Sequence, residues 1–129
     1  MQENIAACAP VASQYAAITA LEKCCDDSSL RNEFKARRDF ICPAINAING
    51  LSCVKPFATF YLFVNIGKTG LNGLEFAYQL LEKEHVAVVP GITYGAGYDD
   101  YIRIAYTMNI DQLKIAVDRI SRFVESLNI

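Results

Sequence analysis

The segment 86–107, VAVVPGITYGAGYDDYIRIAYT, predicts two strands joined by a glycine-rich turn. Residues 86–89 are uniformly apolar, as a short buried strand requires. Pro90–Gly91 ends that strand, because proline has no N–H to donate and glycine tolerates positive φ. Residues 101–106, YIRIAY, form the second strand, in which side chains alternate between the two faces. Arg103 is thus a permanent charge inside an otherwise uncharged strand.

Arg103 is the main candidate for a functional side chain. Arginine stays charged at any accessible pH, and its planar fork matches a carboxylate bidentately. A strand also fixes the direction of the side chain. The residues leave two interpretations open. Arg103 either binds a carboxylate ligand or forms an intramolecular ion pair with an acid such as Asp99 or Asp100.

Length and composition restrict the class of protein. The 129 residues suit one domain, and the net charge of −2 comes with no basic stripe that would favour nucleic acid. No apolar run is long enough to span a bilayer, and the first residues lack the order of a secretion signal. The sequence therefore predicts a cytoplasmic protein with neither a nucleic-acid nor a membrane partner.

The cysteines indicate free thiols in a reducing compartment. Their number is odd, no C-x-x-C spacing occurs, and the lone His85 is distant from all of them, so a zinc site or disulfide framework is not expected. We expect no metal site. The five cysteines are Cys8, Cys24, Cys25, Cys42 and Cys53.

Two helices are predicted before the first strand. Residues 5–24 are apolar on several faces, so this helix requires cover from elsewhere and hints that an N-terminal segment is missing. Residues 30–49 form the second helix, with apolar side chains at three- and four-residue multiples. Pro43 should kink or split it, because proline cannot donate to the carbonyl of Asp39.

The remaining predicted elements are strands and two helices. A short strand is predicted at Cys53–Val54, and Thr59–Ile66 (TFYLFVNI) has the uncharged composition of a central strand. A helix follows Asn72, and a last amphipathic helix follows Asn109. Helices packed on a small, partly antiparallel sheet define an α/β protein of the α+β two-layer sandwich type.

Both of these later helices begin with a capping pattern. Asn72 with Glu75, and Asn109 with Gln112, have the spacing of a capping box. For the earlier helix we predict an inner stripe of Leu74, Ala77, Tyr78 and Leu81. For the last helix we predict an inner face of Leu113, Ala116, Val117, Ile120, Phe123, Val124 and Leu127.

Three weaker motifs suggest other chemistry. The loop PGITYGAG at 90–97 lacks the lysine of a P-loop and precedes a strand, which disfavours nucleotide binding. Ser52–Lys55 fits the S-x-x-K spacing of acyl-transfer serines but does not open a helix. Cys24–Cys25 has no nearby histidine to activate a thiolate. A serine or cysteine hydrolase is the least favoured hypothesis.

Several segments together resemble one known family. The sequence closely resembles the C-terminal part of fold-type-I, pyridoxal-phosphate-dependent aminotransferases of class I/II, in the aspartate/aromatic branch. The match covers essentially the whole chain, and the motifs agree in order and spacing. They are ASQYAAITALE (Q-x-A-A-x-A-A-L), RRDFICPAINAINGL (R-R-D), PFATFYLFVNI (G-A-F-Y-x-F), VAVVPGITYG (V-x-V-x-P-G-x-x-F-G) and YIRIAYT (G-Y-x-R-x-S-Y).

The resemblance implies a role for each part of the chain. Arg103 occupies the position of the arginine that binds the substrate α-carboxylate, and residues 28–129 form the small domain. Residues 1–27 supply the connecting helix from a missing large domain. The sequence departs from the family pattern at three places. Ala58–Thr59 replace the usual glycine-alanine, Tyr94 stands where phenylalanine is common, and Pro43 is unusual inside its helix. These departures leave open which substrate side chain the parent enzyme prefers.

The resemblance also implies what this segment lacks. The Schiff-base lysine, the aspartate facing the pyridine nitrogen and the phosphate-binding residues lie upstream in this family. We therefore expect pyridoxal 5′-phosphate in the parent aminotransferase, which acts on an amino acid and a 2-oxo acid, but no cofactor or catalytic residue on this chain alone. The alternative hypothesis is a free-standing, non-catalytic module that binds small carboxylates or a protein. Self-association or a homodimer is expected, because the apolar N-terminal helices lack cover.

Overall fold

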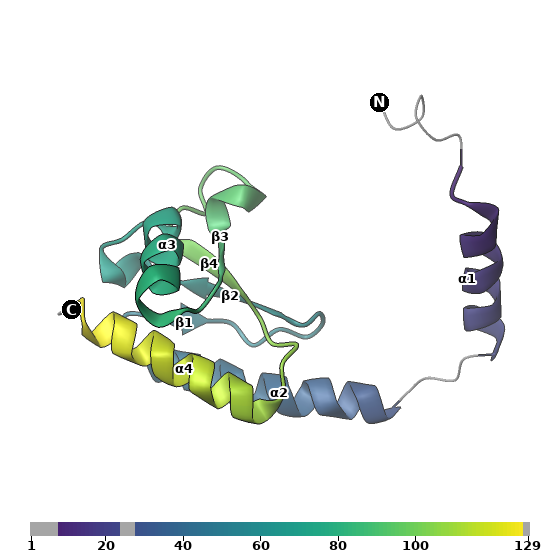
Figure 1. Cartoon of the computed structure of the whole chain (residues 1–129), viewed down its shortest axis with the longest axis horizontal. Helices are drawn as coiled ribbons and strands as arrows, with labels where there is room; N and C mark the ends of the chain where they lie inside the picture. The colour runs from purple at the N-terminus through teal and green to yellow at the C-terminus, as the bar shows by residue number, and fades with distance from the viewer. Residues whose placement is uncertain (1–7, 24–27, 128–129) are drawn as a thin grey trace. The chain divides into compact units, whose positions relative to one another are not determined.

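The computed structural model describes residues 8–23 and 28–127 (Figure 1). The predicted start of the first helix at residues 5–7, and Cys24–Cys25, lie outside the described residues. By their internal contacts the residues divide into two compact units, 1–31 and 32–129. The elements are α1 (Val11–Lys23), α2 (Ser28–Asn46), β1 (Ser52–Cys53), β2 (Tyr61–Asn65), η2 (Gly67–Thr69), α3 (Gly73–Glu84), β3 (Val89–Pro90), η3 (Gly91–Tyr94), β4 (Tyr101–Ala105) and α4 (Ile110–Glu125).

The strands form one sheet with the order β1-β2-β4-β3. All of its pairings among the described residues are antiparallel, and Phe63 of β2 lies directly opposite Arg103 of β4. The predicted central strand is confirmed, since β2 lies between β1 and β4. The predicted fold class, an α+β arrangement of helices on a small sheet, is also confirmed.

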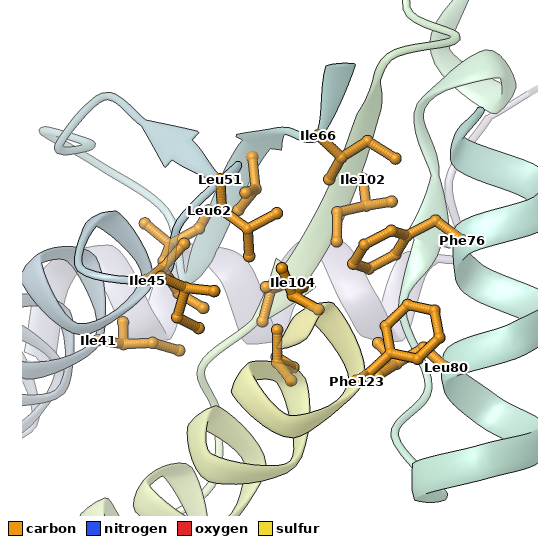
Figure 2. Close-up of a cluster of buried hydrophobic side chains, with 14 of the residues drawn as sticks. Ile41, Ile45, Leu51, Leu62, Ile66, Phe76, Leu80, Ile102, Ile104 and Phe123 are labelled. Carbon is orange, nitrogen blue, oxygen red and sulfur yellow. The ribbon is translucent and has the colours of Figure 1, made fainter. Parts of the chain in front are cut away.

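The hydrophobic core lies between the sheet and helices α2, α3 and α4 (Figure 2). Alternate residues of β2 and β4 are buried in it, which matches the two-residue period of a strand with one covered face. Phe76 of α3 and Phe123 of α4 meet edge to face, with ring centroids 5.0 Å apart. The core includes Ile41, Ile45, Leu62, Val64, Phe76, Leu80, Ile102, Ile104, Leu113, Ile120, Phe123 and Val124.

Helix α2 is continuous through Pro43, so the predicted split does not occur. The helix tolerates the missing donor because Pro43 lies in its last turn, and Ile41, Cys42 and Ile45 bury their side chains on either side of it. The carbonyl of Pro43 still accepts a hydrogen bond from the Ala47 N–H at 3.0 Å. Packing of the apolar face therefore outweighs the local cost of the proline.

Helix α3 begins as predicted but buries a different face. The Asn72 side chain accepts hydrogen bonds from the N–H groups of Leu74 and Glu75, and the Glu75 carboxylate accepts one from the Asn72 N–H, which completes a capping box. The predicted inner stripe is wrong apart from one alanine, since Leu74, Tyr78 and Leu81 are exposed. The buried residues are Gly73, Phe76, Ala77 and Leu80. Residues 74–81 (LEFAYQLL) have apolar side chains on two faces of the helix, and packing against α4 buries the face that includes Phe76.

The strand predicted at 86–89 is shorter and lies further along the chain. The described strand β3 is Val89–Pro90, and Pro90 pairs with Ile102. Proline is tolerated there because β3 is an edge strand, where the outward position needs no donor. Val86 and Val88 pack against the core without joining the ladder. Apolar composition was therefore sufficient to predict burial but not pairing.

The turn between β3 and β4 uses its glycines for two different reasons. Gly95 and Gly97 have φ of 134° and 98°, which other residues rarely adopt. Gly91 is required by close approach, because a Cβ there would overlap the carbonyl oxygen of Tyr98 and lie 2.7 Å from that of Tyr101. The loop is thereby held against the start of β4.

Helix α1 buries none of its side chains in the described residues. Tyr15 and Leu21 keep 68% and 87% of their surface exposed. None of the described helices is long and apolar enough to cross a membrane. The last helix α4, by contrast, buries Leu113, Ile120, Phe123 and Val124, as its amphipathic pattern predicted.

Candidate functional site

An open pocket of about 680 Å³ lies over the face of the sheet that the helices leave uncovered. It extends from the centre of the sheet to the segment between β1 and β2. Alternation in β2 and β4 supplies its floor, since the residues between the buried ones point into it. The lining residues are Ser52, Cys53, Val54, Lys55, Pro56, Phe57, Thr59, Tyr61, Phe63, Asn65, Tyr101 and Arg103.

Arg103 stands on the floor of this pocket, held between aromatic rings. Its guanidinium carbon lies 4.1 Å from the ring centroid of Tyr61 and 5.2 Å from that of Tyr94. Each contact is of the cation–π type, which favours a fixed guanidinium where the rings also exclude water. The predicted site residue therefore lies in a pocket, on a rigid strand.

The guanidinium of Arg103 has no acidic partner among the described residues. The intramolecular ion pair considered with Asp99 or Asp100 is not formed, and no other described carboxylate pairs with it. Its Nε is buried without a hydrogen-bond partner. A buried donor left without an acceptor is costly, so this arrangement suits an acceptor that arrives from outside the described residues.

Aromatic side chains beside Arg103 form a second wall. Phe63 and Tyr101 stack with centroids 4.8 Å apart and planes 8° apart. Tyr98 meets the edge of Phe63 at 5.4 Å, and Tyr94 meets it at 6.1 Å. These supporting residues were not predicted from the sequence. The same period of two that placed Arg103 on its face would have placed Tyr61 and Phe63 beside it.

An ion-pair cluster fixes the opposite edge of the pocket. The Asp39 carboxylate accepts hydrogen bonds from Lys55 Nζ at 2.7 Å and from Arg38 Nε at 2.9 Å. Arg38 Nη1 also donates to the Pro56 carbonyl at 3.4 Å. The bonds from Lys55 and then Arg38 hold the pKa of Asp39 below its ordinary value of 3.8. Lys55 and Pro56 are thereby anchored to α2.

The segment that completes this edge contains a strained residue. Thr59 has φ of 68°, in the left-handed region where a β-branched side chain is rare. Its carbonyl accepts a hydrogen bond of 2.9 Å from the buried Tyr106 hydroxyl, and burial raises the pKa of that tyrosine. Thr59 is one of the two positions at which the sequence departs from the glycine-alanine of the resemblance.

Two cysteines meet at the same edge. Cys42 Sγ and Cys53 Sγ lie 3.7 Å apart, and both residues are free thiols, as is Cys8. The Asn46 side chain accepts from the Cys53 N–H at 2.8 Å and donates to the Cys53 carbonyl at 3.0 Å. Burial, with the neighbouring Cys42 thiol, raises the pKa of Cys53 to about 12.

The weaker motifs gain no support from the geometry. Lys55 pairs with Asp39 and makes no described hydrogen bond with Ser52, so the S-x-x-K residues are not brought together as a base and a nucleophile. His85 is exposed and ends α3 with φ of 57°. No group of three or more histidine, cysteine, aspartate or glutamate residues in the described ranges is arranged to hold a metal ion.

Comparison with known proteins identifies the family. The model of the family described as aminotransferase class I and II matches residues 1–120. The chain belongs to this aminotransferase family. It is 40% identical over 120 residues to an aspartate aminotransferase of Bacillus sp. (strain YM-2), and the match covers 88% of the chain and 30% of that relative.

Two further relatives agree with this assignment. A (5-formylfuran-3-yl)methyl phosphate transaminase of Methanocaldococcus jannaschii is 36% identical over 96% of the chain and 33% of its own length. The crystal structure of an aromatic aminotransferase from Pyrococcus horikoshii OT3 superposes with a TM-score of 0.79 at 34% identity, over 89% of the chain and 31% of that structure. The chain thus spans about a third of the length of these relatives.

Membership of this family implies pyridoxal 5′-phosphate as the cofactor of the whole enzyme. Such a cofactor needs an amine to hold it and an acid near its ring nitrogen. The pocket around Arg103 offers one amine, Lys55, which is engaged with Asp39, and its lining contains no acid. The residues of this pocket therefore do not fit the cofactor itself, whereas Arg103 fits a carboxylate.

Proposed function

We propose that the chain is the small domain of an aminotransferase and that Arg103 binds the α-carboxylate common to the amino acid and 2-oxo acid substrates. The observation that carries the proposal is the guanidinium of Arg103, which faces a pocket without an acidic partner among the described residues. In this proposal residues 28–129 form the small domain, and residues 1–27 connect it to a large domain that supplies the cofactor chemistry.

Arg103 would act by binding and orienting the substrate. Two parallel N–H···O bonds fix both the position and the plane of a carboxylate. The rings of Tyr61 and Tyr94 hold the guanidinium in place before the substrate arrives, which lowers the ordering cost of binding. The uncovered face of the sheet would be closed by the large domain, and exclusion of water would strengthen the ion pair.

The test is substitution of Arg103 in the full-length enzyme that carries this chain. Arg103→Ala should raise KM for amino acids and 2-oxo acids about 100- to 1000-fold, since two charge-assisted hydrogen bonds are lost. Arg103→Lys should have an intermediate effect, because it keeps the charge and loses the fork. Arg119→Ala is the matched control, as Arg119 donates to the Glu84 carbonyl at 3.2 Å and does not line the pocket.

An unchanged KM in Arg103→Ala would overturn the assigned role of the arginine. The division of labour between the two domains has its own test. The 129-residue chain alone should neither transaminate nor keep pyridoxal 5′-phosphate, because its pocket has no free amine. Stoichiometric cofactor absorbance that survives dialysis would contradict this expectation.

The competing hypothesis is a free-standing module that binds small carboxylates or a protein. Family membership and the length of the relatives favour the aminotransferase. The reading frame upstream of Met1 separates the two. A continuous frame that encodes a lysine-bearing large domain supports the proposal, whereas a separate start with its own ribosome site supports the module. A cytoplasmic location and a dimeric state stay predictions.

A further inference from the structure

Cys42 and Cys53 form a pair of thiols that neither the fold nor the proposed function requires. Cys42 belongs to α2 and is buried, while Cys53 belongs to β1, is partly exposed and packs against the core on the side of the sheet that α2 covers. Their sulfur atoms are 3.7 Å apart, which is contact without a covalent bond. They are separated by only 11 positions in the sequence, so the loop between them is short.

Hydrogen bonds already fix the backbone of Cys53 relative to helix α2. The Asn46 amide bonds to both the N–H and the carbonyl of Cys53, at 2.8 and 3.0 Å, and Asn46 lies one helical turn after Cys42. A disulfide needs a sulfur–sulfur distance of about 2.0 Å and close Cβ atoms. Because these hydrogen bonds fix the strand relative to the helix, we expect rotation of the two cysteine side chains to bring the sulfur atoms within bonding distance.

We propose that Cys42 and Cys53 are a reversible disulfide site, closed by exchange with a low-molecular-weight disulfide. The bond would join α2 to β1 at the edge of the Arg103 pocket. The proposal is independent of the aminotransferase activity, since the hydrogen bonds of the two thiols in the described structure join them to each other, to Asn46 and to the Cys42 carbonyl, and not to Arg103.

The exchange occurs in two balanced steps. The Cys53 thiolate attacks a disulfide R–S–S–R, so that a mixed disulfide forms on Cys53 and the first R–S⁻ leaves. The Cys42 thiolate then attacks the sulfur of Cys53, closes the protein disulfide and releases the second R–S⁻. The protons of the two cysteine thiols end on the two released thiols. Two protein thiols are oxidised, and one small disulfide is reduced.

The environment of Cys53 makes the first step slow. With a pKa of about 12, only a small fraction of Cys53 is the nucleophilic thiolate at neutral pH. The rate of the first step should therefore rise about tenfold for each pH unit between pH 7 and 9, in proportion to the thiolate fraction. An excess of small thiol should reopen the bond by the reverse exchange.

The test uses the full chain with the other three cysteines replaced, Cys8→Ser, Cys24→Ser and Cys25→Ser. The protein is treated with hydroxyethyl disulfide and then blocked with N-ethylmaleimide. Trypsin should leave both remaining cysteines in the single peptide 39–68, because the bond between Lys55 and Pro56 resists cleavage. Mass spectrometry should find this peptide lighter by two hydrogens, without maleimide, and dithiothreitol should restore both thiols.

Three results would overturn the proposal. They are two maleimide labels on the peptide, stable hydroxyethyl adducts on both cysteines, or disulfide-linked dimers in place of the closed monomer. Adding Cys42→Ser should stop the reaction at a mixed disulfide on Cys53, and Cys42→Ala repeats this control if the serine variant has lost its circular dichroism. In concentrated urea the unsubstituted pair should accumulate mixed disulfides, because the fold no longer holds the sulfurs together.

Discussion

At the scale of single residues, Asp39 links the pocket edge to helix α2, and its role can be tested by pH. Its pKa is held below 3.8 by Lys55 and Arg38, so the folded state binds this proton less readily than the unfolded chain does. A depressed pKa contributes stability that is present above the unfolded value and is lost as the pH falls through the folded value.

Asp39→Asn should therefore lower the free energy of unfolding at pH 6, and the difference from the wild type should shrink as the pH falls below about 4. Urea titrations at pH 6, 5, 4 and 3 measure this difference. Asp111→Asn is a suitable control, because among the described residues Asp111 pairs only with Lys114, on the surface of α4. A difference that stays constant down to pH 3 would show that the carboxylate charge is not the cause.

The site could be predicted at the residue scale only in part. Arg103 was found because a charge within an uncharged strand is conspicuous in the sequence. Tyr61 and Tyr94, whose rings contact the Arg103 guanidinium, were not predicted, since an aromatic residue in a strand or a turn is also typical of ordinary packing. The contact between Cys42 and Cys53 could not be predicted either, because it depends on how α2 packs against β1.

At the scale of elements, α2 shows a local preference overruled by packing. Proline inside a helix costs about 3 kcal/mol relative to alanine, yet α2 continues through Pro43. The sequence predicted a break because it shows the missing donor and not the core that holds Ile41 and Ile45 in place. The same limitation explains α3, whose buried face depends on contact with Phe123.

Pro43→Ala should therefore stabilise the protein by about 1–3 kcal/mol, because alanine restores the donor to the Asp39 carbonyl. Pro56→Ala is a matched comparison with the opposite sign. Pro56 lies in the loop after β1, where its loss frees the unfolded chain and should cost up to about 1 kcal/mol. Urea denaturation measures both values, and a destabilised Pro43→Ala variant would contradict this account of α2.

At the scale of the whole molecule, the order of elements was predictable because the amphipathic period of α4 specifies one buried face and the uncharged, aromatic and β-branched composition around β2 indicates a central strand. Packing these segments together forms the core of residues 32–129. Helix α1 belongs to the other compact unit, and its apolar side chains are exposed. The periodicity of such a helix does not show which surface covers its apolar side chains.

The exposed apolar side chains of α1 lead to a prediction for the chain as a whole. Val11, Tyr15 and Ile18 follow helical spacing, and Leu21 is adjacent to their stripe. We expect the 129-residue chain to self-associate through this surface, since an uncovered apolar patch favours association. Sedimentation at increasing concentration should show oligomers for the wild type and a monomer for Ile18→Glu combined with Leu21→Glu.

The same double substitution should leave the melting temperature of the core unchanged, because no α1 side chain belongs to the buried cluster of residues 41–124. Gln14→Glu adds a charge to α1 without removing an apolar side chain, so it should still associate. If light scattering shows the wild type as a monomer at every concentration, the α1 surface is not an association site. If the double variant also melts earlier, α1 contributes to the core, and the two units are not energetically independent.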